Sequence, residues 1–523
     1  MAVETEVGTH KVVSTNPATG EVLREIESAT PQEVQDAVAR ARTAQPAWQA
    51  IGVRQRLEIV GKFQQLLNER KQQVAHVITS EAGKPVAEAL LTEVLVVLDA
   101  ARFLLQETYG FIREQPLAHG NIATKAKSGR LIREPYGVIG IISPWNYPFS
   151  IPATETLAAL ATGNAVVLKP SELTPLSALE LASLLHDAGV PDGIFQVVIG
   201  EGPAGAALIE SAIDKLIFTG SVATGRRIAQ TAAARLLPVV LELGGKDPMI
   251  VLDDADVDVA SSGAVWGAFV NAGQACLSVE RCYVHRKIYD AFVSACVEKT
   301  KRLRVGNGAD PGTDVGPLIR ERQLHAVEHH VEEARSRGAR VAAGGERLTS
   351  LGLNYYAPTV LAGVNHDMLV MREETFGPVL PIMSFESDAE GIRLANDSEY
   401  GLAASVWTGD RMRGETIARQ INAGTVMVND SVSCFGISEA PHGGVKASGI
   451  GRTHGRFGLE EMVWTKYLDT DLLPRMKKPW WYGYGAGLSE AAGGLLDFQF
   501  ARGIARRLKG GLRLLPLIRR PGL

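Results

Sequence analysis

Short apolar runs alternate with helical stretches along most of this 523-residue chain, and this alternation constrains the fold more than any other feature. A strand buried on both faces is apolar almost throughout, whereas a strand with one wet face alternates with polar residues. The first block of continuous apolar runs comprises residues 137–143, 165–169, 195–200, 215–220 and 238–244. These runs predict a parallel sheet covered by helices, which is an α/β fold.

A second block of the same kind follows Pro248. Its apolar runs cover residues 248–252, 281–285, 379–385, 402–409 and 425–429. Helical periodicity is expected over residues 255–272, 289–304 and 323–336, and also over residues 30–106, before both blocks. The chain is therefore predicted to form two α/β domains joined near residues 244–248.

Composition excludes several classes of protein. The chain has 54 Lys and Arg against 58 Asp and Glu, so its net charge of −4 does not favour nucleic acid as a partner. Its four cysteines form no C-x-x-C pair, so we expect no metal site and a reducing compartment. The N-terminus lacks the apolar core of a secretory signal, and no uncharged stretch is continuously apolar over a membrane span. These features predict a cytoplasmic protein.

Two glycine-rich turns are candidates for a nucleotide phosphate site. Residues 200–205, GEGPAG, fit the G-x-G-x-x-G pattern between an apolar run and a helix. The acidic residue that a dinucleotide site places about 20 residues later is missing, so an ordinary strand–helix turn is the alternative. The second turn, residues 218–225, also opens a helix, whose free N–H groups would suit a pyrophosphate.

Three side chains could carry chemistry, although each also has a structural explanation. Cys276 lies between Ala and Leu, where a cysteine is commonly a small buried hydrophobe. Glu242 ends an apolar run and either pairs with Lys246 or acts as a desolvated general base. Asn146, within Pro-Trp-Asn-Tyr-Pro, either caps a helix or donates to an oxyanion.

Seven motifs, taken together, resemble the NAD(P)-dependent aldehyde dehydrogenase superfamily. They occur in the family's order: PWNYP, KPSELTP, FTGSVATG, LELGGKDP, NAGQACLSVER, EETFGP and PHGGVKASGIGR. The resemblance covers residues 16–466 and implies an aldehyde dehydrogenase-like fold. Its parts would be a Rossmann-like cofactor domain (1–118 and 135–244), an α/β catalytic domain (245–464) and a small β-flap (119–134 and 465–474). Such a flap extends a neighbour's sheet, which implies a homodimer or homotetramer.

The resemblance also implies roles for the three reactive side chains. Cys276 would attack the aldehyde carbon, and Asn146 with the Cys276 N–H would hold the oxyanion. Glu242 would activate water to hydrolyse the resulting thioester, so the product would be a free carboxylic acid. Two alternatives remain open at this point: a CoA-acylating dehydrogenase, which would share Cys276, and a non-catalytic binding or structural protein on the same fold.

For the cofactor, the resemblance implies that Lys169 and Glu172 bind the adenosine ribose and that Glu374 and Phe376 hold the nicotinamide ribose. Further residues matched to the cofactor site are Ser143, Trp145, Gly202, Gly220, Ser221, Gly225 and Leu243. A carboxylate at position 172 hydrogen-bonds ribose hydroxyls and repels a 2′-phosphate. We therefore expect NAD in preference to NADP.

The substrate tunnel departs from familiar members of the family. Tyr147, Val270, Cys434, Phe435 and His442 are expected to line it, with Glu439 as a further candidate on the loop of residues 430–440. Many members have Phe where this chain has His442. The imidazole could simply hydrogen-bond the backbone, or it could contact a polar substrate or its carboxylate.

Residues 475–523 lie beyond the resemblance and form a basic extension. They hold ten Lys and Arg against Glu490 and Asp497. Trp480, Trp481 and Tyr482 follow two lysines, an arrangement that suits a membrane interface. Apolar residues then recur at near-helical spacing among basic ones: Phe500, Ile504, Leu508, Leu512 and Leu515. Such an amphipathic helix could lie on anionic lipid, pack on the acidic body of the protein or remain disordered.

Overall fold

The computed structural model describes residues 11–478 and 480–514. The chain divides into two compact units. The first comprises Met1–Phe111 and Pro135–Val463, and the second comprises Ile112–Glu134 and Trp464–Leu523. Both predicted α/β sheets and all the candidate catalytic and cofactor residues belong to the first unit.

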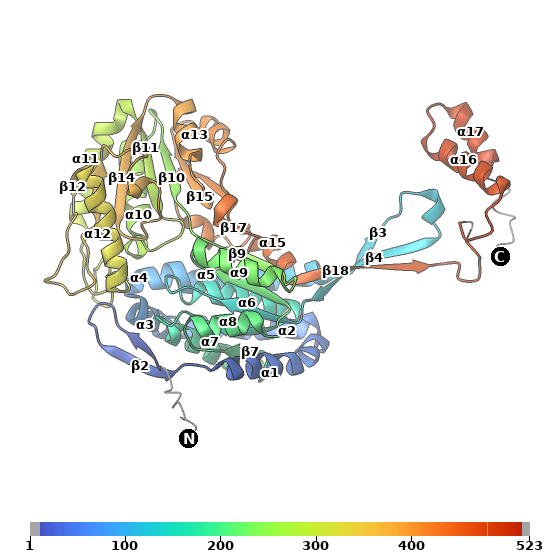
Figure 1. The fold of residues 1–523 in the computed structure, drawn as a ribbon, viewed down its shortest axis with the longest axis horizontal. Coiled ribbons are helices and arrows are strands. Elements are labelled where there is room, and N and C mark those ends of the chain that lie inside the picture. Colours follow the sequence, from blue (N-terminus) through green and yellow to red (C-terminus); the bar gives the residue numbers. More distant parts are fainter. Residues whose placement is uncertain (1–10, 479, 515–523) are drawn as a thin grey trace, which may run out of the picture. The chain divides into compact units, whose positions relative to one another are not determined.

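A six-stranded sheet forms one half of the first unit, in the strand order β17-β9-β8-β5-β6-β7 (Figure 1). Its parallel strands match the first five predicted runs: β5 (Val138–Ile142), β6 (Ala165–Lys169), β7 (Phe195–Val197), β8 (Lys215–Thr219) and β9 (Val239–Glu242). The helices between them are α6 (Ser150–Thr162), α7 (Pro175–Ala188), α8 (Gly202–Glu210) and α9 (Val222–Ala233). A short antiparallel strand, β17 (Gly449–Ile450), pairs with β9. Parallel strands bring their carboxyl ends to one edge, where ligands bind in folds of this class.

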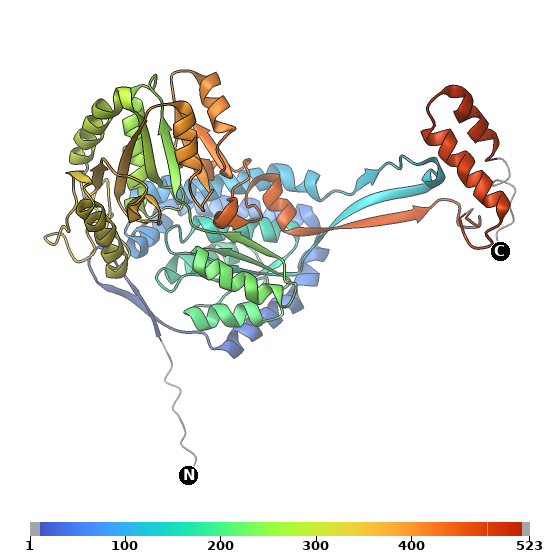
Figure 2. The ribbon, with the colours of Figure 1, turned by 45° about the horizontal axis from the view of Figure 1, so that its top comes forward.

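The N-terminal segment packs beside this sheet as a group of helices (Figure 2). They are α1 (Pro31–Ala50), α2 (Gly52–Glu69), α3 (Lys71–Ala82), α4 (Val86–Glu88) and α5 (Leu95–Ile112), with a π-helical segment η1 (Ala89–Val94) before α5. Thr30 starts α1 through a capping box with Glu33. The hairpin of β1 (Lys11–Thr15) and β2 (Val22–Glu27) precedes them, and its charged, mostly exposed strands gave no apolar signal in the sequence.

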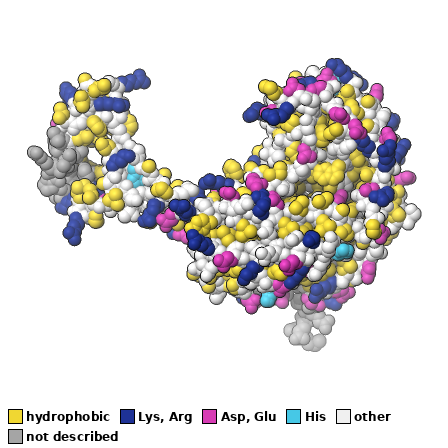
Figure 3. All heavy atoms as spheres, turned by 180° about the vertical axis from the view of Figure 1, so that it is seen from behind, with side chains coloured by type: hydrophobic (Ala, Val, Ile, Leu, Met, Phe, Trp, Pro, Cys, Tyr) yellow, Lys and Arg dark blue, Asp and Glu magenta, His cyan; other side chains and the backbone are white. Residues whose placement is uncertain are grey.

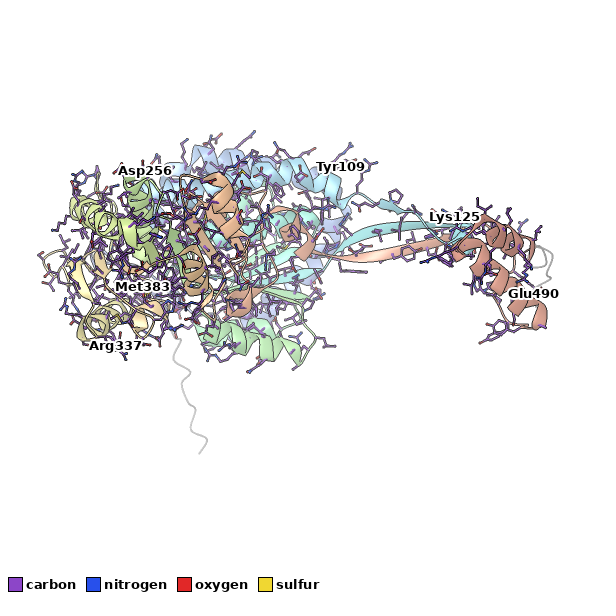
Figure 4. The ribbon with its side chains drawn as sticks, turned by 90° about the horizontal axis from the view of Figure 1, so that it is seen from above. Tyr109, Lys125, Asp256, Arg337, Met383 and Glu490 are labelled. Atoms are coloured by element: carbon purple, nitrogen blue, oxygen red, sulfur yellow. The ribbon has the colours of Figure 1, made fainter. Side chains whose placement is uncertain are left out.

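A seven-stranded sheet forms the other half of the first unit, in the order β12-β13-β14-β11-β10-β15-β16. Its strands are β10 (Asp247–Val251), β11 (Val279–His285), β12 (Arg340–Ala343), β13 (Thr359–Ala362), β14 (Val379–Phe385), β15 (Ala403–Trp407) and β16 (Thr425–Val428). Its helices are α10 (Val257–Phe269), α11 (Tyr289–Arg302), α12 (Glu321–Ser336), α13 (Asp388–Asn396) and α14 (Arg411–Ala418). Asp256 caps α10, with its carboxylate accepting from Val259 N at 3.0 Å (Figure 4). Residues 243–246 connect the two sheets, and α15 (Gly455–Glu461) packs on α6.

The second unit contains a three-stranded sheet and a helical hairpin. The sheet has the order β18-β4-β3, from β3 (Gln115–Leu117), β4 (Lys127–Pro135) and β18 (Val463–Asp471). The hairpin consists of α16 (Ala486–Phe500) and α17 (Ile504–Leu512). Their backbones meet closely, because a Cβ on Gly510 would lie 2.6 Å from the carbonyl oxygen of Gly494.

The hairpin corrects the expectation of one amphipathic helix in the C-terminal extension. Phe500 ends α16 and therefore does not continue the apolar row of Ile504, Leu508 and Leu512 on α17. Leu515 lies outside the described residues. In the described part of the chain, no helix has the length and apolar character needed to cross a membrane.

Candidate active site

Three cavities are arranged around Cys276 in the first unit. An outer groove of about 950 Å³ lies at the carboxyl ends of β5, β6 and β8. An inner groove of about 360 Å³ shares Trp145, Gly220 and Ser221 with the outer groove and reaches Cys276. A tunnel of about 260 Å³ is lined by Cys276 and Glu242, which also line the inner groove. A connected path therefore leads from the sheet edge to Cys276 and on into the tunnel.

Cys276 lies on a loop whose backbone is tightly constrained. The loop follows a 3₁₀ turn, Val270–Gly273, in which Asn271 and Ala272 have φ values of 53° and 54°. Gly273 also has a positive φ of 71°, and a Cβ there would lie 2.1 Å from the carbonyl oxygen of Gly377. Left-handed non-glycine residues cost of order 1–3 kcal/mol each and persist only where the surrounding structure imposes them. The packing of this loop thus fixes the position of the thiol.

Asn146 faces this loop from the turn after β5. Its Nδ2 donates to the carbonyl of Gln274 at 3.1 Å, and its own carbonyl accepts from Asn271 Nδ2 at 2.9 Å. Among residues 11–478 and 480–514, no acceptor pairs with the backbone N–H of Cys276. Asn146 and Cys276 both line the inner groove, so a side-chain amide and an unpaired backbone N–H border the space beside the thiol.

A buried ion pair anchors the Asn146 turn. Lys84 Nζ donates to Glu93 Oε1 at 2.7 Å and to the carbonyl of Asn146 at 2.8 Å, and neither charged side chain is exposed. The other oxygen of Glu93 accepts from the backbone N–H groups of Phe149 and Ser150, both at 2.9 Å, at the start of α6. Lys84 Nζ also lies 3.9 Å from the ring centroid of Tyr147. One ion pair therefore orders the whole turn.

Glu242 ends β9, and its side chain is buried where the inner groove meets the tunnel, both of which Cys276 also lines. Gly449 of β17 pairs with Glu242 across the sheet. The backbone carbonyl of Glu242 accepts from Gly220 N at 2.9 Å. In the part of the chain that the structure describes, neither carboxylate oxygen has a hydrogen-bond partner. His442 Nε2 lies 4.0 Å from Glu242 Oε2. Burial, reinforced by the charge of Glu155, raises the pKa of Glu242 well above its usual range.

The pairing of Glu242 with Lys246, considered from the sequence, does not form. Lys246 Nζ instead lies 2.5 Å from Glu280 Oε2, and both side chains are buried. Glu280 also accepts from the backbone N–H groups of Thr375 and Phe376, at 2.9 Å each. Lys246 and Glu280 thus order the loop that carries Phe376.

Glu374 and Phe376 lie on this loop in the wall of the inner groove. Glu374 Oε1 accepts from Gly245 N at 3.3 Å, and burial raises the pKa of its carboxyl to about 8. Phe376 packs edge-on against Trp145, with ring centroids 5.4 Å apart. Trp145 follows the carboxyl end of β5 and Phe376 comes from the other half of the unit, and both line the inner groove.

The outer groove contains most of the remaining residues that the sequence assigns to the cofactor. Ser143, Trp145, Lys169, Glu172, Gly202, Gly220 and Ser221 line it, and Leu243 lines the inner groove. Lys169 Nζ lies 3.5 Å from Glu172 Oε2. Ser221 caps α9 by accepting from Thr224 N. Gly225 does not line the groove; it lies within α9, where a Cβ would be 2.5 Å from Leu243 Cδ2, so it allows α9 to pack on Leu243.

Comparison with known proteins decides the family. The sequence profile of the Aldehyde dehydrogenase family matches residues 3–468. The chain belongs to the aldehyde dehydrogenase family. It is 40% identical over 488 residues to a 4,4′-diapolycopene aldehyde oxidase of Methylomonas sp, covering 93% of this chain and 91% of that protein. It is 39% identical over 458 residues to a mitochondrial succinate-semialdehyde dehydrogenase of Oryza sativa subsp. japonica, covering 87% and 85%.

A solved structure supports the same assignment. The NAD⁺ complex of an aldehyde dehydrogenase from Bacillus cereus is 38% identical in sequence, with a TM-score of 0.85, and the match covers 89% of this chain and 94% of that one. This aldehyde dehydrogenase is therefore an oxidoreductase that converts an aldehyde into a carboxylic acid with NAD(P)⁺. When bound, the nicotinamide supplies the hydride acceptor.

The residues of the grooves fit such a dinucleotide. The hydroxyl of Ser143 is buried without a hydrogen-bond partner among the described residues, so it is available to a ligand. A Cβ on Gly220 would lie 2.6 Å from Phe218 Cζ, so the turn before α9 leaves no room for a side chain. The N–H groups in the first turn of α9 suit a pyrophosphate, as expected at a helix N-terminus.

The surroundings of the Cys276 thiol disfavour its ionised form. Burial raises the pKa of Cys276 well above that of a free cysteine, and the charges of Asp247, Glu374 and Glu242 raise it further. A thiol attacks a carbonyl carbon only as its thiolate, so a reactive Cys276 would first have to lose its proton.

The structure separates the residues expected in the tunnel into two groups. Tyr147, Phe435 and His442 line it. Val270 and Cys434 do not; both are buried in an apolar cluster with Leu277 and Leu402, behind the surface of the tunnel wall. The backbone of His442 pairs with Thr453, and its ring faces Glu242 and packs edge-on against Phe435, with centroids 5.0 Å apart. Glu439 is exposed and forms an ion pair with Arg102 at 2.6 Å.

Many residues of the tunnel wall are absent from the sequence-based candidates, among them Leu91, Leu95, Glu155 and His454. The sequence could have indicated Glu155, because a carboxyl group among the small and apolar residues of α6 needs an explanation, as Glu242 does at the end of β9. Burial raises its pKa to about 8. Leu91 and Leu95 gave no signal, since apolar residues at helical spacing normally indicate core.

We expect Glu93→Gln to destabilise the protein strongly. The amide cannot neutralise Lys84, and removing one partner of a buried ion pair typically costs about 3–5 kcal/mol. Chemical unfolding should show a clearly lowered midpoint, with reduced aldehyde oxidation because the Asn146 turn loses its anchor. Glu58→Gln, at an exposed position of α2, is the matched control and should unfold like the parent. Equal midpoints for the parent and the Glu93 variant would show that the ion pair contributes little.

Proposed function

We propose that Cys276, Asn146 and Glu242 carry out the oxidation. The Cys276 thiol loses its proton to solvent water, and the thiolate attacks the carbonyl carbon to form a thiohemiacetal. Asn146 Nδ2–H and the Cys276 N–H donate to the oxyanion that forms on the aldehyde oxygen. After loss of hydride, the carbon remains bound to Cys276 as a thioester.

Glu242 then accepts a proton from water, whose oxygen attacks the thioester carbon. The C–S bond breaks, the acid leaves and Cys276 recovers its thiolate. The observation that carries this proposal is that Glu242, buried and without a hydrogen-bond partner in the described structure, lines the same two cavities as Cys276. A carboxylate held in this way is suited to activating water, which favours hydrolysis over transfer to CoA.

Two substitutions separate the steps. Cys276→Ala should abolish NADH formation, because no thiohemiacetal forms. Glu242→Gln should give a burst of NADH close to one equivalent of enzyme, followed by turnover slowed by about 10²–10⁴-fold, because general-base catalysis contributes only to hydrolysis. Rapid-mixing absorbance without CoA measures both phases. Cys296→Ala, at a buried cysteine of α11 that lines none of these three cavities, is the control and should keep the parental rate. A Cys276→Ala enzyme with normal turnover would refute the mechanism.

We also propose that Glu172 favours NAD over NADP. It lies on the wall of the outer groove beside Lys169, where a carboxylate repels a 2′-phosphate. Glu172→Gln should therefore raise the ratio of kcat/KM for NADP to that for NAD, measured with one aldehyde. An unchanged ratio would remove Glu172 as the source of the preference.

The second unit supports two further parts of the proposal. Its three-stranded sheet would extend that of a neighbouring copy, so that the enzyme is a homodimer or homotetramer. Its helical hairpin would contact anionic membrane lipid as a peripheral attachment of a cytoplasmic enzyme. Ile504, Leu508 and Leu512 of α17 are each more than 60% exposed. Hydrophobic and basic side chains lie side by side on the hairpin surface (Figure 3).

A chain ending at Met476 tests the hairpin. The full chain should co-sediment with vesicles that contain phosphatidylglycerol, and less so at high salt, because the basic residues are screened. The shortened chain should stay in the supernatant while keeping its activity and, in sedimentation velocity, the oligomer formed by the flap. If both chains stay in the supernatant, the hairpin serves contacts between protein copies and not a membrane.

A further inference from the structure

The tunnel that ends at Cys276 has a predominantly apolar wall. Much of the wall comes from η1, α5, α6, residues 275–277 and residues 432–436. Its aliphatic members include Leu91, Leu95, Val96, Ile151, Leu277 and Leu402. Within the described residues, neither Lys nor Arg lines it. A carboxylate carried by a substrate would therefore enter without a counter-charge, and burying an unpaired charge is strongly unfavourable.

The ionisable groups of the wall supply no cation either. Burial lowers the pKa of His442 to about 3 and that of His454 to about 4, so both imidazoles are neutral at pH 7. The carboxyl groups of Glu155 and Glu242 belong to the same wall and offer an anion no positive charge. Aromatic faces are also partly occupied: Lys84 covers one face of Tyr147, and Phe435 packs against both histidines. A cationic substrate therefore finds Trp266 at the tunnel wall but no set of open aromatic faces that surrounds it.

Large apolar side chains line the tunnel and are nevertheless exposed. Leu91 is 63% exposed, Leu95 53% and Trp266 45%. Leu91 and Leu95 are four residues apart across η1 and the start of α5, and Trp266 comes from α10. Isolated exposed apolar residues are ordinary, but three that line one cavity provide a surface that an apolar ligand would cover. We call these three residues the mouth cluster.

We infer that this enzyme takes aldehydes with a long, uncharged hydrocarbon chain, with the carbonyl at Cys276 and the distal carbons against the mouth cluster. The inference rests on the proposed function, in which Cys276 is the atom that reacts. A cavity of about 150 Å³ accommodates benzene, so a tunnel of about 260 Å³ holds roughly ten carbon atoms. Chains longer than this would extend over the mouth cluster, and each added carbon would then raise kcat/KM by less.

A series of straight-chain aldehydes tests the inference with the full-length protein and NAD. We expect kcat/KM to rise about fourfold per methylene from butanal to decanal, since each buried methylene contributes that factor. Succinate semialdehyde and betaine aldehyde should fall below butanal. A flat series, or a preference for either charged aldehyde, would overturn the inference and leave the oxidation mechanism standing. If no aldehyde in the panel yields NADH, the proposed function itself fails, and this inference fails with it.

A substitution in the mouth cluster supplies the matched comparison. Leu95→Gln preserves size but removes apolar surface, so it should lower the ratio of kcat/KM for decanal to that for butanal several-fold. Leu353→Gln, at a leucine that is 82% exposed and does not line the tunnel, should leave that ratio unchanged. Because each ratio is measured within one enzyme preparation, a partial loss of folded protein does not affect it. Equal ratios for the two variants would exclude the mouth cluster from substrate binding.

Discussion

The buried ion pair between Lys84 and Glu93 holds together the segments on which the active site depends. Lys84 follows α3, Glu93 lies in the π-helical segment η1, and both contact the turn between β5 and α6. A buried charge is stable only when all of its hydrogen-bonding capacity is met, and here backbone groups complete the pair. The same carbonyl of Asn146 that accepts from Lys84 also accepts from Asn271 Nδ2, in the turn that precedes Cys276. The position of Asn146 is thus tied to the position of the thiol.

A second buried ion pair, Lys246 with Glu280, orders the backbone on the other side of Cys276. Glu280 holds the backbone of Thr375 and Phe376, while Gly273 and Gly377 meet too closely for any side chain at position 273. The cysteine loop therefore lies between two rigid supports, one in each half of the unit. Left-handed residues such as Asn271 persist because these supports over-determine the loop.

The sequence predicts the two sheets well because a strand buried on both faces leaves a local record. The five runs from 137–143 to 238–244 each became a strand of the six-stranded sheet. Glu242 stood out for a related reason, since a carboxylate at the end of an apolar strand demands an explanation. Val270 and Cys434 show the limit: chain position cannot tell whether an apolar side chain lies on the surface of a tunnel or just behind it. The two buried ion pairs escaped notice because their partners are 9 and 34 residues apart and only the fold brings them together.

Desolvation links the chemistry of this site to its choice of substrate. The burial that raises the pKa of Glu242 also makes its carboxylate a stronger base once the proton is lost, and burial raises the pKa of the Cys276 thiol as well. A charged substrate would bring its own counter-ions and water into the tunnel and weaken both effects. A hydrocarbon chain instead displaces water from the wall. In the proposed mechanism, hydrogen bonds from Asn146 and from the Cys276 N–H to the oxyanion would be strongest in a dry tunnel, because the local dielectric is low. An apolar substrate therefore completes the environment that the catalytic groups require.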